Sequence, residues 1–513
     1  MMVGGRESTM QSWRAAIVRL TQRPAVMLTV LAALLALQIR PWWLPVPDGC
    51  GYLSIARSIA HGGPVTNLGS AKLHFAPGYP LLASLAYLVD DHPFLWLSIL
   101  QWLLAVVFML GVYRWSRRAV PGAELWITAL TMVNASLWMH VRLTISETAF
   151  MAALVWTIDA LDHLAAAQSR RAVWRWAAAA AVMTIVVTMT RQVGILVAAG
   201  YGLAMLVSAV RRRTSWPRAI GTTLAVGLPA TLAVLAVMVY ETRMAHAAGL
   251  SHRTYLDYFH ETGVSWAAQV LEGLRLRISE AGRLLIPGMY KTYAESGVWL
   301  DLNVAVYALL FAGLSWSWWR IVRRASNVFA LTMPFYLGLY IVYPFDQGTR
   351  YLLPALPVLV LCLWYLLERI PQPHRGRTCV VLVLLHLGVA VGSSVRATRP
   401  LEAVNRQWPA IETLVAMIDD DARTVQVWNA PPFAGEMVQL AGDRRVEYQD
   451  QTAIDPAAGW LITSVASPEY PGFVEHARAG SMKLLERAPQ LSQAGQPPTM
   501  PGGQVPGEQT LVH

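Results

Sequence analysis

A set of ionisable side chains stands at the ends of apolar stretches of this sequence. The set consists of the acids Asp48, Glu147 and Asp346, the arginines Arg142, Arg191 and Arg350, and His74. An acid can accept the proton of an attacking hydroxyl, and a guanidinium group can stabilise a phosphate on which charge develops. If these side chains converge, the resulting pocket suits the transfer of a group from a phosphate carrier to a hydroxyl.

The composition indicates that such a pocket is built in a membrane. Of the 513 residues, 55% are hydrophobic and only 14% are charged, which is typical of a chain that spans a bilayer. The net charge of +10 does not predict a nucleic-acid partner, because the arginines lie between apolar runs and form no single patch. Cys50, Cys362 and Cys379 are odd in number and lack metal-ligand spacing, which argues against a disulfide framework or a zinc site.

The apolar stretches predict an all-α polytopic membrane protein. A span needs about 17–25 mostly apolar residues, and about eleven stretches approach this rule. They begin near Ala25, Phe94, Leu125, Leu143, Ala177, Val193, Ala219, Val298, Val328, Tyr351 and Thr378. The first follows Arg14, Arg19 and Arg23 and lacks a small-residue cleavage site, so we interpret it as a span and not as a cleaved signal.

The short loops predict the orientation of the chain. Arginines recur in alternate loops, as in 114–118, 170–175, 211–218, 320–324 and 369–377, and they also occur before the first span. Because cytoplasmic loops retain basic residues, these loops and the N-terminus are expected in the cytoplasm. The acids and arginines of the opening set then lie at the outer face, and the C-terminus lies outside. The expected location is the inner (plasma) membrane of a bacterium.

Three outer segments are longer than turns, at residues 45–93, 241–297 and 396–513. Tyr52, Ile55 and Ala56 recur at helical spacing just after Asp48, which predicts an amphipathic helix along the interface. A second interfacial helix is expected between Val270 and Leu285. Residues 396–488 predict a small α/β domain, with strands at 424–428, 445–448 and 460–463 and a helix at 433–440. Residues 489–513 are rich in Gln, Gly and Pro and predict a disordered tail.

Four patches, in this order along residues 25–370, resemble a known superfamily. They are Pro47-Asp48-Gly49-Cys50-Gly51-Tyr52-Leu53 with His74-Phe75-Ala76-Pro77-Gly78-Tyr79-Pro80, then Ser146-Glu147, then Thr190-Arg191-Gln192-Val193-Gly194, and finally Arg350-Tyr351-Leu352-Leu353-Pro354. Together they resemble the GT-C glycosyltransferases. The greatest similarity is to the bacterial branch that includes relatives of protein O-mannosyltransferases and the lipid A aminoarabinose transferase.

The resemblance implies a GT-C-like helical bundle over residues 1–395 and an inverting transfer at the outer face. The implied donor is a sugar on a polyprenyl phosphate, the acceptor group is a hydroxyl or amine, and membrane lipids surround the enzyme. The acceptor molecule stays open among an envelope glycolipid, a polysaccharide and a protein. Asp48 corresponds to the acid/base residue of the family. Many relatives carry a second acid directly after it, whereas this chain has Gly49, so Glu147 is the candidate second acid and use of a divalent metal stays open.

The predicted site therefore has three groups of residues. Asp48 and Glu147 are the catalytic candidates. Arg350, Arg191 and Tyr351 are expected to bind the donor phosphate, and the expected substrate contacts are Tyr52, His74, Tyr79 and Arg142.

Each assignment has a structural alternative. Asp48 could cap the helix that follows it, and Arg142 could pair with Glu147. Arg191 and Arg350 could extend to lipid headgroups, and His74 could be a polar residue of the interface.

Two other functions fit parts of the sequence. A transporter or lipid flippase would also have many spans with charges near the membrane, although such proteins place substrate sites near the midplane and often contain repeats. A scaffold would present the C-terminal domain to envelope partners. The transferase hypothesis predicts that Asp48, Glu147, Arg191 and Arg350 line one outward-opening cavity; if they face different lipid sectors, only the fold analogy supports it.

Overall fold

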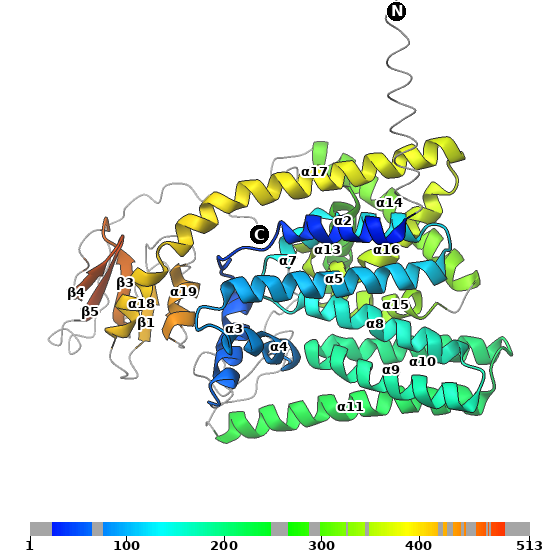
Figure 1. Cartoon of the computed structure of the whole chain (residues 1–513), viewed down its shortest axis with the longest axis horizontal. Helices are drawn as coiled ribbons and strands as arrows, with labels where there is room; N and C mark the ends of the chain where they lie inside the picture. The colour runs from blue at the N-terminus through cyan, green and yellow to red at the C-terminus, as the bar shows by residue number, and fades with distance from the viewer. Residues whose placement is uncertain are drawn as a thin grey trace, which may run out of the picture.

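The protein is a bundle of long helices that carries a small α/β unit at one end, as seen in a computed structural model (Figure 1). The structure describes residues 23–63, 75–247, 265–286, 298–324, 327–343, 348–418, 424–427, 434–442, 446–447, 458–467, 470 and 473–487. His74, Asp346 and the predicted tail at 489–513 lie outside these ranges. Long helix α17 (Gln372–Asn405) runs along one side of the bundle and leads into the α/β unit.

Each predicted span falls on helical structure. The bundle contains α2 (Pro24–Ala36), α5 (Phe94–Ala119), α6 (Glu124–Met132), α7 (Ala135–Val141), α8 (Glu147–Ala166), α9 (Arg170–Thr190), η1 (Gln192–Ile195), α10 (Leu196–Val210), α11 (Trp216–Ala247), α14 (Val298–Arg324), α15 (Val328–Val342), η3 (Gly348–Ala355), α16 (Leu356–Leu367) and α17. Within the described residues, seven helical segments are long and apolar enough to cross a membrane, and α2 and α15 are shorter apolar helices.

The stretch that begins near Leu125 is not one continuous helix. It breaks between α6 and α7, where the side chain of Asn134 accepts hydrogen bonds from the backbone N–H groups of Ser136 and Leu137. An asparagine that caps a new helix in this way ends the preceding one. The next span, predicted to begin near Leu143, begins at Glu147 as α8.

Helices are present at both positions where an amphipathic helix was predicted, but the first is buried on every side from Gly49 to Ala56 and lacks the expected exposed polar face. They are α3 (Pro47–Ala60) and α13 (Trp266–Leu285), and a further short helix, α4 (Gly78–Tyr87), packs against α3. Val46 occupies the N-cap position of α3, so Asp48 lies within the first turn. Asp48 is therefore not the N-cap residue, and its side chain needs another explanation.

The α/β unit contains a five-stranded sheet in the order β2-β1-β3-β5-β4. Strand β1 (Thr424–Val427) pairs in parallel with β2 (Val446–Glu447) and β3 (Ala458–Ser464), whereas β5 (Met482–Arg487) is antiparallel to β3 and to β4 (Phe473–Ala479). Helices α18 (Trp408–Ala416) and α19 (Ala434–Gly442) accompany the sheet. The predicted strands and helix are confirmed, and the β4–β5 hairpin is an addition to the prediction.

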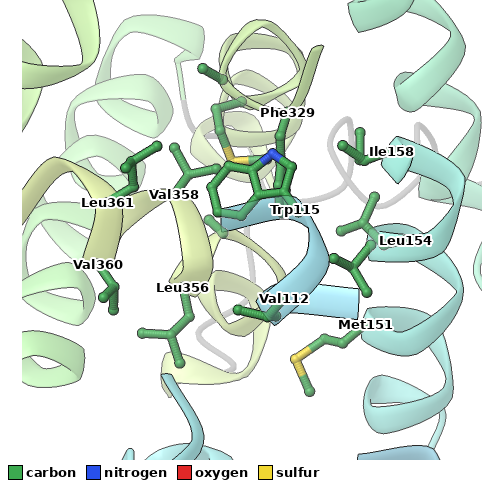
Figure 2. Packing of buried hydrophobic residues seen from close by; sticks show 14 of the residues in the cluster. Val112, Trp115, Met151, Leu154, Ile158, Phe329, Leu356, Val358, Val360 and Leu361 are labelled. Atoms are coloured by element: carbon green, nitrogen blue, oxygen red, sulfur yellow. The ribbon is translucent and has the colours of Figure 1, made fainter. Parts of the chain in front are cut away.

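Among the described residues there are two large apolar cores and one small apolar cluster, made by Leu461, Tyr470 and Leu485. The larger core fills the bundle, where Trp115 of α5 packs edge-on against Phe329 of α15 with ring centroids 5.0 Å apart (Figure 2). The second core runs from α3 and α4 into the α/β unit. In it, Trp43 stacks on Phe94 and meets the edge of Trp408. The unit that follows α17 is thus packed directly against the helix that carries Asp48.

Candidate active site

Two carboxylates and two guanidinium groups meet at the end of the bundle that carries α3. Arg350, in η3, donates from Nη1 to Oδ2 of Asp48 at 2.5 Å and from Nε to Oε1 of Glu147. Arg191 donates from Nη1 to the same oxygen of Glu147. We call Asp48, Glu147, Arg191 and Arg350 the carboxylate cluster. The transferase hypothesis predicted that these four residues line one cavity; the structure brings their side chains into contact.

The members of the carboxylate cluster differ in their access to solvent. The side chain of Glu147 is 0% exposed, that of Arg350 is 13% exposed, and that of Asp48 is 39% exposed. A buried carboxylate with two guanidinium partners is suited to holding those partners in place. Asp48 is the acid that an incoming molecule can reach.

Short local features position these groups. Asp48 and Glu147 both lie in the first turn of a helix, α3 and α8 respectively, where the positive end of the helix dipole favours an acid. Arg191 lies in the turn between α9 and η1, with extended backbone geometry. The site therefore depends on four segments that are distant in sequence. Each contributes a residue at or near one of its ends.

Aromatic rings surround the guanidinium groups. The guanidinium carbon of Arg191 lies 5.2 Å from the ring centre of Tyr351 and 5.8 Å from that of Phe150, and Arg350 lies 6.0 Å from Tyr351. These distances are typical of cation–π contacts. Burial opposes the charge of Arg191, but the carboxylate of Glu147 outweighs it and raises the pKa of Arg191 above its ordinary value. Arg191 therefore stays cationic.

Tyr52 and Tyr79, the two tyrosines predicted as substrate contacts, lie next to the carboxylate cluster. The hydroxyl of Tyr52 lies 2.9 Å from Oγ of Ser146, and that of Tyr79 accepts a hydrogen bond from Nε2 of Gln101 at 2.8 Å. Burial, and then the charge of Glu147, raises the pKa of Tyr52 above its ordinary value, so its phenol stays protonated. Tyr79 is fully buried. It supports Tyr52 edge-on and offers no exposed surface to a substrate.

The sequence did not single out Gln101, and it named Ser146 only as part of the patch Ser146-Glu147. Gln101 is 1% exposed and also donates to the carbonyl of Ile145, so it fixes the chain just before Glu147. The feature of the sequence that could have indicated Gln101 is its position as an isolated glutamine within the apolar stretch from Phe94. A polar residue buried in a span is expected to have a specific partner.

Arg142 lies outside the carboxylate cluster. It does not pair with Glu147; its Nε donates to Oε1 of Gln38 at 2.5 Å. The alternative of an Arg142–Glu147 ion pair is therefore wrong for this structure. His74, the remaining predicted contact, is outside the described residues.

Gly49 cannot be replaced by an acid without a local shift. A Cβ atom at this position would lie 2.9 Å from Cγ2 of Val46 and 3.3 Å from Oγ1 of Thr144. Among the described residues, no group of three or more His, Cys, Asp or Glu side chains is arranged to hold a metal. Asp48 and Glu147 both accept from Arg350 instead. Within the described part of the chain, both acids of the site are therefore engaged by arginine.

The chain has the fold of the GT-C glycosyltransferases, as the resemblance of its motifs predicted. Among solved structures with this fold is ArnT of Cupriavidus metallidurans bound to undecaprenyl phosphate, with a TM-score of 0.54 and 12% identity over 91% of this chain and 98% of that one. The apo form of ArnT has a TM-score of 0.55 and 11% identity, again over 91% of this chain and 98% of that one. ArnT is a lipid A aminoarabinose transferase.

A second similar protein is the oligosaccharyltransferase of Archaeoglobus fulgidus in complex with zinc and sulfate. Its TM-score is 0.55 at 14% identity, and the alignment covers 85% of this chain and 68% of that one. No family model and no curated protein matches the sequence. The similarity to both proteins is therefore one of fold.

Proposed function

We propose that this protein is a membrane glycosyltransferase that moves a sugar from a polyprenyl phosphate to an acceptor hydroxyl or amine at the outer face. The observation that carries the proposal is the carboxylate cluster, in which a partly exposed acid lies beside two guanidinium groups at one end of the bundle. The fold supports it, since both similar proteins are glycosyltransferases and one is bound to undecaprenyl phosphate.

The proposed reaction is a single displacement. The acceptor oxygen or nitrogen attacks the anomeric carbon and forms the new glycosidic bond, while the bond from that carbon to the phosphate oxygen breaks. Asp48 takes the acceptor proton, and the polyprenyl phosphate leaves with the bonding electron pair. Attack from the face opposite the leaving group inverts the anomeric centre.

Arg350 and Arg191 stabilise the leaving group in this proposal. A guanidinium fork matches two phosphate oxygens and cannot lose its proton at neutral pH. Stabilisation is useful where charge develops during the reaction, on the bridging oxygen as the bond to the sugar breaks. Tyr351, which contacts both guanidinium groups, helps to keep them oriented.

Glu147 acts as a positioning residue and not as a second base. It is fully buried and accepts from both arginines, so an acceptor cannot reach it. Its charge would keep Arg191 and Arg350 in place before the donor arrives. The pre-arranged cations then need little reorganisation when the phosphate leaves.

The direct test uses purified full-length protein with a panel of polyprenyl-phosphate sugars and an envelope extract as the acceptor source. We expect consumption of at least one donor with release of polyprenyl phosphate and a glycosylated product. Vesicles that contain only this protein serve as the comparison. Transport of a lipid-linked sugar into or across these vesicles, with every donor left intact, would favour a flippase and overturn the transferase.

A further inference from the structure

A second pair of arginines lies near the same end of the bundle. Arg142 follows α7, and Arg40 follows the end of α2. Gln38 connects them, because its side-chain oxygen accepts from Nε of Arg142 at 2.5 Å, and its carbonyl accepts from Oγ of Ser98 at 3.4 Å. The same Ser98 oxygen accepts from the backbone N–H of Arg40 at 2.9 Å. We call Gln38, Arg40 and Arg142 the arginine pair site.

The arginine pair site carries positive charge without an acid. Within the described ranges, the charged group that acts on Arg142 is Arg40 and not an acid, and the side chain of Arg40 donates to the carbonyl of Ile39. Burial, and then the charge of Arg40, lowers the pKa of Arg142 to about 10. In the carboxylate cluster, by contrast, two carboxylates balance two guanidinium groups. An additional anion is therefore favoured at the arginine pair site.

Two buried donors at this site have no acceptor. Among the described residues, Nε2 of Gln38 and Nη2 of Arg142 are buried and make no hydrogen bond. Gln38 as a whole is 2% exposed. Buried donors form hydrogen bonds in nearly all folded proteins. Two buried donors without an acceptor, one of them on the Arg142 guanidinium group, therefore indicate that an acceptor binds here. Phosphate offers several acceptor oxygens and matches a guanidinium fork.

The site lies where phosphate groups of lipids lie. α2 ends at Ala36, and α5, one of the seven candidate spans, begins at Phe94; Gln38 and Ser98 are close to these two ends. The ends of spans meet the headgroup region of a bilayer. Arg40 and Arg142 are only partly buried, so their guanidinium groups are the part of the site that the phosphate of a lipid would approach.

We propose that Gln38, Arg40 and Arg142 bind the phosphate group of a lipid next to the carboxylate cluster. The two sites are connected by the segment from Arg142 to Glu147. In this segment Thr144 accepts a hydrogen bond from Nε1 of Trp43 at 2.8 Å and lies against Gly49. Occupancy of the arginine pair site would hold this segment in place. The lipid is either a polyprenyl phosphate or a glycerophospholipid, because both present the same phosphate chemistry.

Lipid binding to the intact protein tests this proposal without turnover. Full-length protein in mild detergent is titrated with a polyprenyl monophosphate, or in a second arm with phosphatidylglycerol, and bound lipids are counted by native mass spectrometry. The double variant Arg40→Gln/Arg142→Gln is expected to lose one bound lipid, with affinity at least tenfold weaker. Loss in the first arm alone identifies the polyprenyl carrier, and loss in both arms identifies a general lipid-phosphate site.

Two further variants keep the test decisive. Arg170→Gln/Arg171→Gln removes the same charge from exposed residues at the start of α9 and is expected to bind lipid like the wild type. Gln38→Glu supplies an internal carboxylate to the arginines, so we expect weaker lipid binding with unchanged thermal stability. Wild-type binding by both site variants, or equal loss in the Arg170/Arg171 control, overturns the proposal. Neither result depends on whether Asp48 supports sugar transfer.

Discussion

Arg350 links two carboxylates that are distant in sequence. Its partners Asp48 and Glu147 are 302 and 203 positions away. The sequence predicted the members of this cluster from charge type, from their positions at the ends of apolar runs and from motif resemblance. It could not predict which acid each arginine contacts, because that depends on how the helices rotate and pack.

Replacement of Arg350 tests this central contact. Arg350→Gln leaves Glu147 buried with one guanidinium partner fewer, and loss of a buried ion-pair partner costs about 3–5 kcal/mol of stability. We expect lower thermal stability and loss of transfer. In a double-mutant cycle, Glu147→Gln combined with Arg350→Gln should destabilise by less than the sum of the single changes. Additive effects would show that the two side chains are not coupled. The control is Arg117→Gln, which removes a guanidinium group at an exposed position.

Gly49 provides a second test at this scale. Gly49→Asp would place a second acid directly after Asp48, at the position where many members of the family that this chain resembles carry one. The added Cβ would crowd Val46 and Thr144. Overpacking of this kind costs about 1–3 kcal/mol, so we expect lower thermal stability and slower transfer. Gly221→Ala, where no atom lies within 4 Å of the added Cβ, should change neither quantity appreciably. Faster transfer by Gly49→Asp would mean that the missing acid limits this enzyme.

Individual elements differ in how well their sequence predicts them. The helical spacing of Tyr52, Ile55 and Ala56 predicted the helix α3, but it did not predict that α3 is buried on every side from Gly49 to Ala56. The break at Asn134 was missed because the residues around it are mostly apolar and a single asparagine within such a stretch does not by itself indicate a helix end. The β4–β5 hairpin was missed because β4 alternates weakly between apolar and polar residues. The available signal was Gly480, which has a φ of 57° in the turn between the two strands, as tight hairpin turns require.

The α/β unit should depend on the aromatic contact that Trp408 of α18 makes with Trp43, just before α3, and with Phe94 at the start of α5. Trp408 contacts Trp43 and Phe94 with ring centroids 5.8 Å and 5.5 Å away, and removing a buried tryptophan costs about 3–5 kcal/mol. Trp408→Ala is expected to make the chain after residue 405 sensitive to limited proteolysis and to slow transfer, because α3 carries Asp48. Trp174→Ala, where the residue is 66% exposed, is the matched control. Unchanged proteolysis of the Trp408 variant would show that other contacts hold the unit.

At the scale of the whole molecule, the alternation of arginine-rich loops is the basis for the proposed orientation. The helices confirm the positions of the apolar segments, and the GT-C fold fits a membrane protein with its site at one end. Within the described residues, seven of the about eleven predicted spans are long and apolar enough to cross a membrane, because the apolar composition required of a span is strict. The packing of the α/β unit against α3 involves contacts distant in sequence and could not be predicted in this way.

Cysteine labelling tests the orientation. The three native cysteines are buried, so new cysteines can report selectively. We expect Val474→Cys, at a position that is 60% exposed in the α/β unit, to react with a membrane-impermeant maleimide in cells with a permeable outer layer. Arg171→Cys, in a predicted cytoplasmic loop, should react only after the inner membrane is opened. The reverse pattern would place the carboxylate cluster on the cytoplasmic side.

The most direct test of the account is sugar transfer by the Asp48→Asn variant, compared with Asp91→Asn. Asp91 is 81% exposed and pairs only with the exposed His61 among the described residues, so its change removes the same charge outside the site. If Asp48 takes the acceptor proton, its replacement should lower the transfer rate at least about a hundredfold, with normal expression and membrane insertion, while Asp91→Asn stays active. Full transfer by Asp48→Asn would contradict the assignment of Asp48 as the base.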